Sequence, residues 1–148
     1  MTTGQRSAPA QRRALEAYVK LMRGAGSVQG RLESRLLARG LTESQFGVLE
    51  ILLHRGPRSP RELKDKLLTT GGNVTMVVDN LEKRGWVERV RDAVDRRRLS
   101  VRLTPAGRRV IEGLFPEHAR AIVEELSVLT AAEQEELGRL CRKIGRRD

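Results

Sequence analysis

One turn of the sequence carries an acidic residue followed by three bases, in the order Asp95, Arg96, Arg97 and Arg98. The next five residues, LSVRL, alternate apolar and polar side chains, which is the period of a half-buried strand. Like charges on one turn repel each other unless an anion neutralises them. We therefore interpret the turn as a binding site for a polyanion, in which Asp95 pairs with a neighbouring arginine and fixes its direction. A solvated hairpin that is merely basic is the alternative.

A second set of polar side chains lies on the outward face of a helix predicted from about residue 71 to residue 84. The apolar residues of this stretch recur at helical spacing and face inward: Val74, Val77, Val78 and Leu81. The outward face carries Gly72, Asn73, Thr75, Met76, Asp79 and Lys83. Small residues at a helix start allow close approach to nucleic acid, Asn73 matches the adenine edge, and Thr75 matches a phosphate or a thymine methyl group. The pattern predicts a recognition helix, with an ordinary solvated face as the alternative.

No set of residues has the spacing of an enzyme or metal site. His54 and His118 stand alone, without a zinc-ligand partner at helical spacing. The stretch GAGSVQG lies inside a helical pattern with no strand before it, and Gly71 and Gly72 are not followed by the lysine of a phosphate loop. We therefore expect no catalytic residue, no metal and no cofactor.

The elements that must position these residues are mainly helical. Apolar periodicity and capping residues predict helices over 12–39, from Thr42 to about Gly56, after Ser59, over 71–84, after Thr104 and after Thr130. Between the fourth and fifth of these, WVERV and LSVRL form a two-stranded hairpin around the arginine turn. The expected fold class is mainly α with a small β hairpin.

Positive charge is concentrated around this hairpin. The 148 residues carry a net charge of +10, and the segment 83–109 alone has ten basic and three acidic residues. A focused basic patch is the electrostatic footprint of a nucleic-acid partner. The single cysteine, Cys141, excludes an intrachain disulfide, and no apolar run is long enough to span a bilayer. These features predict a soluble cytoplasmic protein without membrane contact.

The terminal helices carry apolar stripes that a small core within 42–103 cannot cover. These stripes include Leu15 near the N-terminus and Leu137, Leu140 and Ile144 near the C-terminus. The simplest partner surface is a second copy of the chain. We expect a single chain, 1–148, in which 42–103 forms the DNA-binding lobe and 12–39 with 105–147 forms an all-helical dimerisation region.

The stretch LTTGGNVTMVVDNLEKRGWVERVRDAVDRRRLSVRLTPAGRRV resembles the core of the multiple-antibiotic-resistance regulator (MarR) family of bacterial transcription factors. The DRR motif at Asp95 and the LTPAG motif at 103–107 carry the resemblance, which extends more loosely over nearly the whole chain. It implies a winged helix–turn–helix fold and an obligate homodimer that binds a palindromic operator in double-stranded DNA, usually as a repressor. It also implies that Arg97 enters the minor groove.

The resemblance further implies release from DNA by a small aromatic or anionic effector. We expect such an effector where the first, second and fifth helices meet the DNA-binding lobe, near Tyr18, Met22 and Phe46. The alternative is that these three side chains simply fill the core. The peroxide-sensing branch of the family places its reactive cysteine near the N-terminus, so we expect Cys141 to act as a small apolar residue of the last helix.

A non-specific nucleoid-associated or RNA-binding winged-helix protein is the competing hypothesis. Both kinds of protein require a basic hairpin, so charge alone does not separate them. A sequence-specific regulator prefers one palindrome over random duplex by ~10³-fold or more, whereas an architectural protein does not. Operator preference is therefore the discriminating property.

Overall fold

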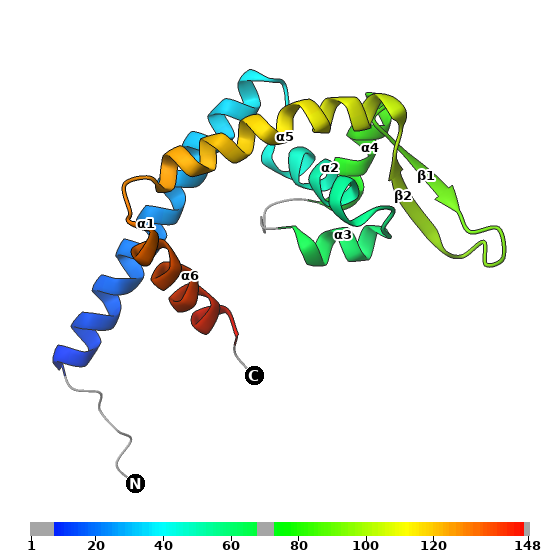
Figure 1. Cartoon of the computed structure of the whole chain (residues 1–148). Helices are drawn as coiled ribbons and strands as arrows, with labels where there is room; N and C mark the ends of the chain where they lie inside the picture. Colours follow the sequence, from blue (N-terminus) through cyan, green and yellow to red (C-terminus); the bar gives the residue numbers. More distant parts are fainter. Residues whose placement is uncertain (1–7, 68–72, 147–148) are drawn as a thin grey trace, which may run out of the picture.

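The computed structural model describes residues 8–67 and 73–146, which form six helices and one two-stranded hairpin (Figure 1). In chain order these are α1 (Ala8–Ala38), α2 (Glu43–Arg55), α3 (Pro60–Lys66), α4 (Val74–Lys83), β1 (Val87–Arg91), β2 (Leu99–Leu103), α5 (Pro105–Leu126) and α6 (Ala131–Gly145). The predicted fold class, mainly α with a small β hairpin, is confirmed. None of the described helices is both long and apolar enough to cross a membrane.

Short capping motifs determine where most helices begin. Thr42, Ser59 and Thr130 each accept a hydrogen bond from the backbone three residues later, and the side chain of that later residue accepts one in return. These reciprocal bonds satisfy two backbone donors that a helix start leaves unpaired. Proline occupies the first position of α3 and of α5, where its missing N–H is no loss. The three capping residues from which the sequence predicts helix starts are confirmed.

The fourth helix begins later than the sequence pattern predicts. Asn73 has extended backbone angles and is the N-cap of α4, because its side-chain oxygen accepts a hydrogen bond from the backbone N–H of Thr75 at 3.0 Å. The helix therefore starts at Val74. Gly71 and Gly72, which the pattern places at its start, lie outside the described residues.

The hairpin is antiparallel, with Val87 opposite Leu103 at its base and Arg91 opposite Leu99 near its tip. A third backbone segment extends it: Arg58 exchanges two backbone hydrogen bonds with Val101 of β2, at 3.1 and 2.8 Å. The turn between α2 and α3 thus fixes one edge of the hairpin to the helical lobe.

The core lies where α2, α3 and α4 meet the base of the hairpin and the first half of α5. Its fully buried side chains are aliphatic and include Leu49, Leu63, Val78, Leu81, Val101 and Ile111. The scarcity of aromatic residues in the sequence is therefore matched by a core of leucine, valine and isoleucine.

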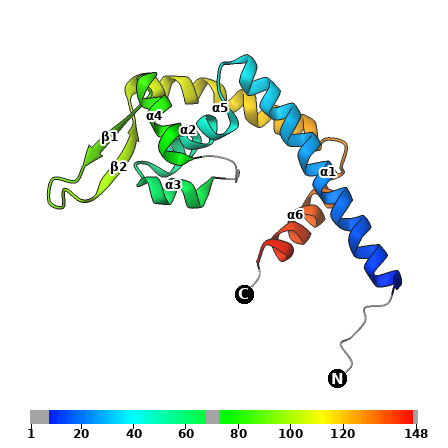
Figure 2. The ribbon, with the colours of Figure 1, turned by 180° about the vertical axis from the view of Figure 1, so that it is seen from behind.

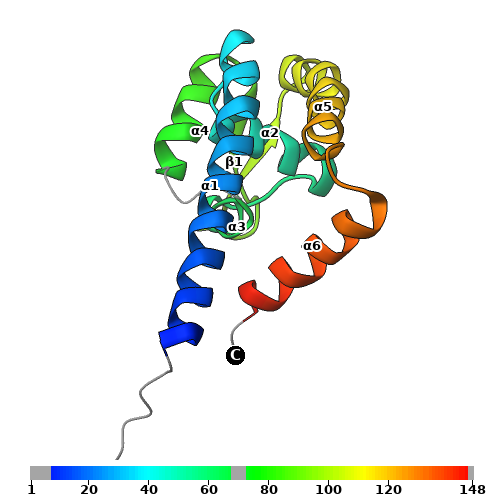
Figure 3. The ribbon, with the colours of Figure 1, turned by 90° about the vertical axis from the view of Figure 1, so that its left-hand side faces the viewer.

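The terminal helices extend away from this lobe, at the end of the molecule opposite the hairpin tip (Figures 1 and 2). Leu36 is the only buried residue of α1 among those described, and α6 has none. From the front, the N-terminal half of α1 and the whole of α6 run in different directions (Figure 1), and from the side α6 runs obliquely from the end of α5 (Figure 3). Three ion pairs tie the second half of α1 to α5: Arg31–Glu125 at 2.7 Å, Arg35–Glu124 at 2.9 Å and Arg39–Glu117 at 2.7 Å.

Candidate nucleic-acid interface

The turn of the hairpin is organised by Asp92, a residue that the sequence analysis did not single out. Its carboxylate accepts hydrogen bonds from the backbone N–H groups of Val94 at 2.8 Å and Asp95 at 3.2 Å. These backbone donors hold the pKa of the Asp92 carboxyl below its ordinary value. An aspartate that bonds the backbone two and three residues ahead is a local turn signal, so the sequence did contain the information needed to identify Asp92.

Asp95 contacts two of the three tip arginines. Its carboxylate accepts hydrogen bonds from the backbone N–H of Arg97 at 3.1 Å and from Nε of Arg97 at 3.3 Å, and it lies 3.9 Å from Nε of Arg98. The Arg97 side chain nevertheless remains 93% exposed. Asp95 therefore restricts the direction of the Arg97 guanidinium while leaving it accessible to an anion.

The other two tip residues differ in their surroundings. The carbonyl of Arg96 accepts a hydrogen bond from Nη1 of Arg91 at 2.9 Å, while the Arg96 side chain is exposed and has no partner among the described residues. Arg98 is also exposed, and its backbone donates to the carbonyl of Asp95 at 3.0 Å. The tip thus presents three guanidinium groups on a backbone closed by Asp92 and Asp95.

The outward face of α4 presents the side chains expected from helical spacing, with one change of role. Thr75, Met76 and Lys83 are exposed, and Val74, Val78 and Leu81 are buried. Asn73 is exposed too, but its side-chain oxygen already accepts the capping bond from Thr75. Because bidentate pairing with adenine uses that same oxygen as well as the amide nitrogen, the cap leaves the amide donors as the freer part of Asn73. Gly72 lies outside the described residues.

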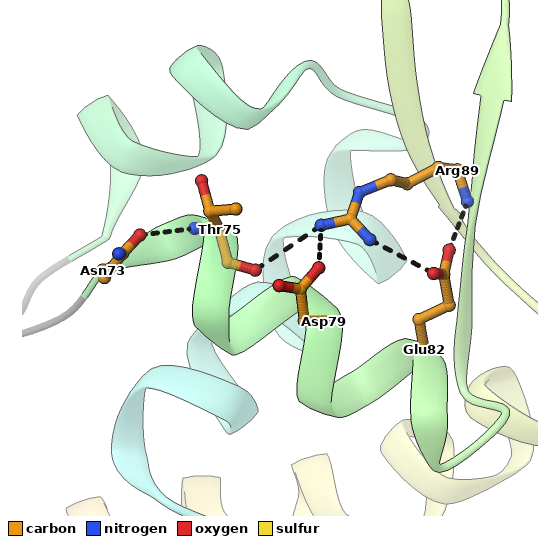
Figure 4. Close-up of polar contacts among 5 residues, drawn as sticks. All are labelled: Asn73, Thr75, Asp79, Glu82 and Arg89. Atoms are coloured by element: carbon orange, nitrogen blue, oxygen red, sulfur yellow. Dashed lines mark hydrogen bonds and ion pairs between the residues drawn. The ribbon is translucent and has the colours of Figure 1, made fainter.

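Arg89 of β1 is the most heavily engaged arginine near this face, and sequence reasoning missed it (Figure 4). Its Nη2 donates to the Asp79 carboxylate at 2.5 Å and to the Thr75 carbonyl at 3.5 Å, and its Nη1 donates to the Glu82 carboxylate at 3.2 Å. Its backbone N–H donates to the other Glu82 oxygen at 3.3 Å. The available signal was a pair of acids, Asp79 and Glu82, on a helix expected to approach a polyanion.

A cavity of about 460 Å³ opens beside α2 and α5. Its lining includes Phe46, His54, Arg55, Lys66 and His118. Phe46, which is 2% exposed, packs against the His118 ring at 4.3 Å between centroids, and burial lowers the pKa of His118 below its ordinary value. The structure does not bring Tyr18 and Met22 to this cavity, because both lie exposed on the N-terminal half of α1.

The four residues expected at a dimer interface are all accessible in the isolated chain. Leu15 and Ile144 are each 57% exposed, and Leu137 and Leu140 are 40% and 43% exposed. Cys141, next to Leu140 in α6, is exposed as well. Among residues 8–67 and 73–146, no three histidine, cysteine or carboxylate side chains come together as metal ligands.

The sequence is similar to a known protein family and to a curated transcriptional regulator. Residues 39–98 match a family model described as "MarR family". The chain is 31% identical over 133 residues to the HTH-type transcriptional regulator MhqR of Bacillus subtilis, covering 90% of this chain and 92% of that protein.

Two solved structures share the fold closely. The regulator BpsR of Bordetella bronchiseptica, whose DNA binding is described as regulated by 6-hydroxynicotinic acid, superposes with a TM-score of 0.78 at 26% identity, over 86% of this chain and 91% of that one. A variant of MarR from E. coli in complex with operator DNA superposes with a TM-score of 0.78 at 27% identity, over 89% and 95% of the two chains.

Proposed function

Because the chain belongs to the MarR family and is a DNA-binding transcriptional regulator, we propose that it acts as a repressor, binding a palindromic operator as a homodimer. The observation that carries this proposal is the tip of the hairpin, where Asp95 bonds to both the backbone and the side chain of an exposed Arg97. An arginine held in one direction is suited to a specific contact, whereas a freely rotating one adds only charge.

The two candidate reading elements fit the two grooves of a duplex. A helix with polar residues at its start, as Asn73 and Thr75 are in α4, fits the major groove, where base edges are distinguishable. The hairpin tip then reaches the flanking minor groove, in which narrow A·T-rich stretches concentrate negative potential and favour arginine. In this arrangement Asn73, Thr75, Met76 and Lys83, together with Gly72, face the major groove, and Asp95, Arg96, Arg97 and Arg98 form the minor-groove contact.

The proposed dimer is supported by the exposed apolar side chains of the terminal helices. Leu15 of α1 and Leu137, Leu140 and Ile144 of α6 are left open to solvent in the single chain. Burying such side chains against a second copy stabilises the assembly by removing apolar surface from water. In this arrangement 12–39 and 105–147 form the dimerisation region, 42–103 forms the DNA-binding lobe, and a two-fold protein axis requires a palindromic site.

Selection of bound duplexes from a random library tests this proposal. We expect the selected sequences to converge on one palindrome, bound ~10³-fold or more tightly than random duplex. Convergence on no sequence, with equal affinity for all duplexes or for RNA, would instead favour the non-specific nucleoid-associated or RNA-binding alternative.

We further propose that a small aromatic acid releases the protein from its operator by entering the cavity beside Phe46. The cavity offers aromatic surface from Phe46, His54 and His118 for a planar ring. Arg55 and Lys66 are the candidate partners for its carboxylate, although Glu43 and Glu50 also line the cavity and balance their charge. The effector reported for BpsR, 6-hydroxynicotinic acid, is of this chemical class. Tyr18 and Met22 do not line this cavity in the single chain, so the proposed site is anchored on Phe46.

Titration of the operator complex with salicylate and nicotinate tests the effector site. Release should occur with the natural chain and require higher concentrations with Phe46→Leu, which keeps an apolar side chain but removes the ring. Operator affinity without effector serves as the control for folding. Release at the same concentration from both proteins would count against this cavity.

A further inference from the structure

The network around Arg89 joins the candidate recognition helix to the hairpin. We propose that Arg89 is a positioning residue that fixes the angle between α4 and the hairpin, so that the major-groove and minor-groove contacts are made together; this inference rests on the proposed mode of DNA binding. Its contacts reach the first turn of α4 at Thr75, the middle at Asp79 and the last turn at Glu82 (Figure 4). Because Arg89 contacts α4 at both ends, it restrains the direction of the helix relative to the hairpin as well as the distance between them.

Arg89 is poorly placed to bind DNA itself. Its side chain is 22% exposed, against 93% for Arg97 at the tip. Both terminal nitrogens of its guanidinium already donate to oxygen atoms of α4. A phosphate could replace these partners only by leaving Asp79 and Glu82 without their counter-charge, close to a polyanion.

Charge on α4 shows why such a residue is needed. The helix carries two acids, Asp79 and Glu82, and one base, Lys83. An acidic helix face is repelled by the phosphates on either side of a groove. Arg89 pairs with both carboxylates from the side of the hairpin and offsets one of their two negative charges, so the pairing that holds the two elements together also reduces the repulsion.

The covalent connection fixes how the chain leaves α4, because the backbone N–H groups of Gly85 and Trp86 donate to the carbonyls of Glu82 and Leu81, but it does not tie the hairpin to the rest of the helix. Only three residues, 84–86, separate the end of α4 from the start of β1, and Gly85 among them has a φ of 76°, in the left-handed region that favours glycine. On the helix side of this turn, the Arg84 guanidinium lies over the Trp86 ring at 3.7 Å and donates to the Gly40 carbonyl at 2.6 Å. Arg89 is therefore a side-chain link that spans α4 and β1 beyond the turn.

A variant that removes Arg89 together with both of its acidic partners tests the proposal. Combining Asp79→Asn, Glu82→Gln and Arg89→Ala removes the link but leaves the chain with one more positive charge than before. We expect operator affinity to fall by roughly tenfold, the size of a coupling within one ion-pair network. Affinity for random duplex should not fall. In a hydroxyl-radical footprint, protection of the flanking minor groove should weaken while protection around α4 persists.

Arg102→Ala is the matched control. Arg102 pairs with Glu88 across the same hairpin at 2.6 Å and, among the described residues, with no side chain of α4, so its loss removes one ion pair and one charge without freeing the angle. We expect similar, small losses on operator and on random duplex, with an unchanged footprint. Circular dichroism at the temperature of the binding assay establishes that each variant is folded. Arg89→Lys, which keeps the charge but cannot serve three partners, should show a partial loss of operator preference.

The outcomes separate the inference from the proposed function. A natural chain without operator preference overturns the proposed function, and with it the role of Arg89. Two results together overturn only the inference. The natural chain prefers its operator, and the folded triple variant or the folded Arg89→Lys variant keeps the same preference and the same footprint. A dependence of log K on log salt that becomes shallower by about one unit in Arg89→Ala also overturns it, because such a change indicates that Arg89 itself neutralises a phosphate.

Discussion

Asp95 brings a negative charge into the most basic part of the chain, and its contacts explain why. It accepts two hydrogen bonds from Arg97 and lies near Arg98, and Asp92 closes the backbone of the same turn. Two carboxylates are thus used to hold the tip in shape, while the three guanidinium groups stay accessible. The residues of the turn therefore hold Arg97 in a restricted direction while leaving it exposed.

The wing variants separate a directed arginine from a cationic patch. Arg97→Ala should weaken operator binding by ~1–3 kcal/mol per tip, and the dependence of log K on log salt should become shallower by about one unit for each phosphate that is no longer neutralised. Arg98→Ala, nearer the strand, should cost less. Asp95→Ala should also weaken binding although it removes a negative charge, because Arg97 is then free to point in other directions.

Affinity measurements across a salt series check these three variants. Simple electrostatics predicts the opposite sign for Asp95→Ala, since that tip is more basic. Tighter binding by Asp95→Ala, together with equal losses for Arg97→Ala and Arg98→Ala, would mean that the tip acts only through its charge.

Residues separated by a few positions were accessible to sequence reasoning, and residues that meet through the fold were not. The pairing of Asp95 with an arginine follows from spacing along one turn. The pairing of Arg89 with Asp79 and Glu82 depends on how the hairpin folds back over α4, which periodicity does not reveal. Asn73 was placed correctly near the start of α4, but its capping bond depends on a helix boundary, and boundaries are poorly determined by apolar spacing.

The elements themselves follow closely from local chemistry, because capping boxes and turn residues act over three or four positions. The glycine of the LTPAG motif, Gly107, is required by a tertiary contact and not by the local helix start. A side-chain carbon at Gly107 would overlap the backbone of Trp86, so α5 packs directly on the turn that leads into β1. The sequence showed the motif but not the close approach that requires it.

Gly107→Ala should therefore destabilise the fold by about 3 kcal/mol, the upper part of the usual cost of overpacking, because the obstructing atoms are backbone. Gly113→Ala is the matched control in the same helix. Outside the backbone of α5 itself, no atom of the described residues lies within 4 Å of the added carbon there, so the free energy of unfolding should rise by ~0.5–1 kcal/mol from helix propensity. Urea unfolding of both variants measures the difference, and equal values would contradict the assigned packing.

The contact between α2 and α5 should depend on pH through His118. Burial lowers the pKa of this imidazole below its ordinary value of 6.5, with Glu50 opposing the shift, so the unfolded chain binds the proton more readily than the folded one. The contribution to stability is fully present above the unfolded pKa and is lost as pH falls toward the folded pKa.

His118→Phe keeps the ring against Phe46 and removes the titration. Between about pH 7.5 and about pH 5.5, a window around the ordinary histidine pKa, the natural chain should lose more stability than this variant. Free energies of unfolding measured across the window give the comparison. An equal loss in both proteins would show that protonation of His118 carries no such penalty.

At the scale of the whole molecule, the chain divides into a lobe with a closed aliphatic core and terminal helices without one. Ion pairs from α1 to α5, such as Arg31 with Glu125, hold the second half of α1 against the second half of α5. Apart from Leu36, no described residue of α1 or α6 is buried, which is the physical basis for proposing a homodimer.

Leu137→Asp combined with Leu140→Asp should convert the proposed dimer into monomers and abolish operator binding, because two carboxylates would have to be buried at the interface. Arg142→Asp is the control, since helical spacing places it on the opposite face of α6. Sedimentation analysis reports the oligomeric state. A double variant that remains dimeric would show that the interface lies elsewhere.

The most direct test of the account is one titration, by fluorescence anisotropy, of the selected palindrome, the same duplex with one half-site scrambled, and a random duplex. The account predicts one dimer per palindrome, with an affinity ~10³-fold or more above that for random duplex. Scrambling one half-site should remove most of that preference, because both lobes of the dimer must engage. Equal affinity for all three duplexes would contradict a two-fold, sequence-specific operator complex.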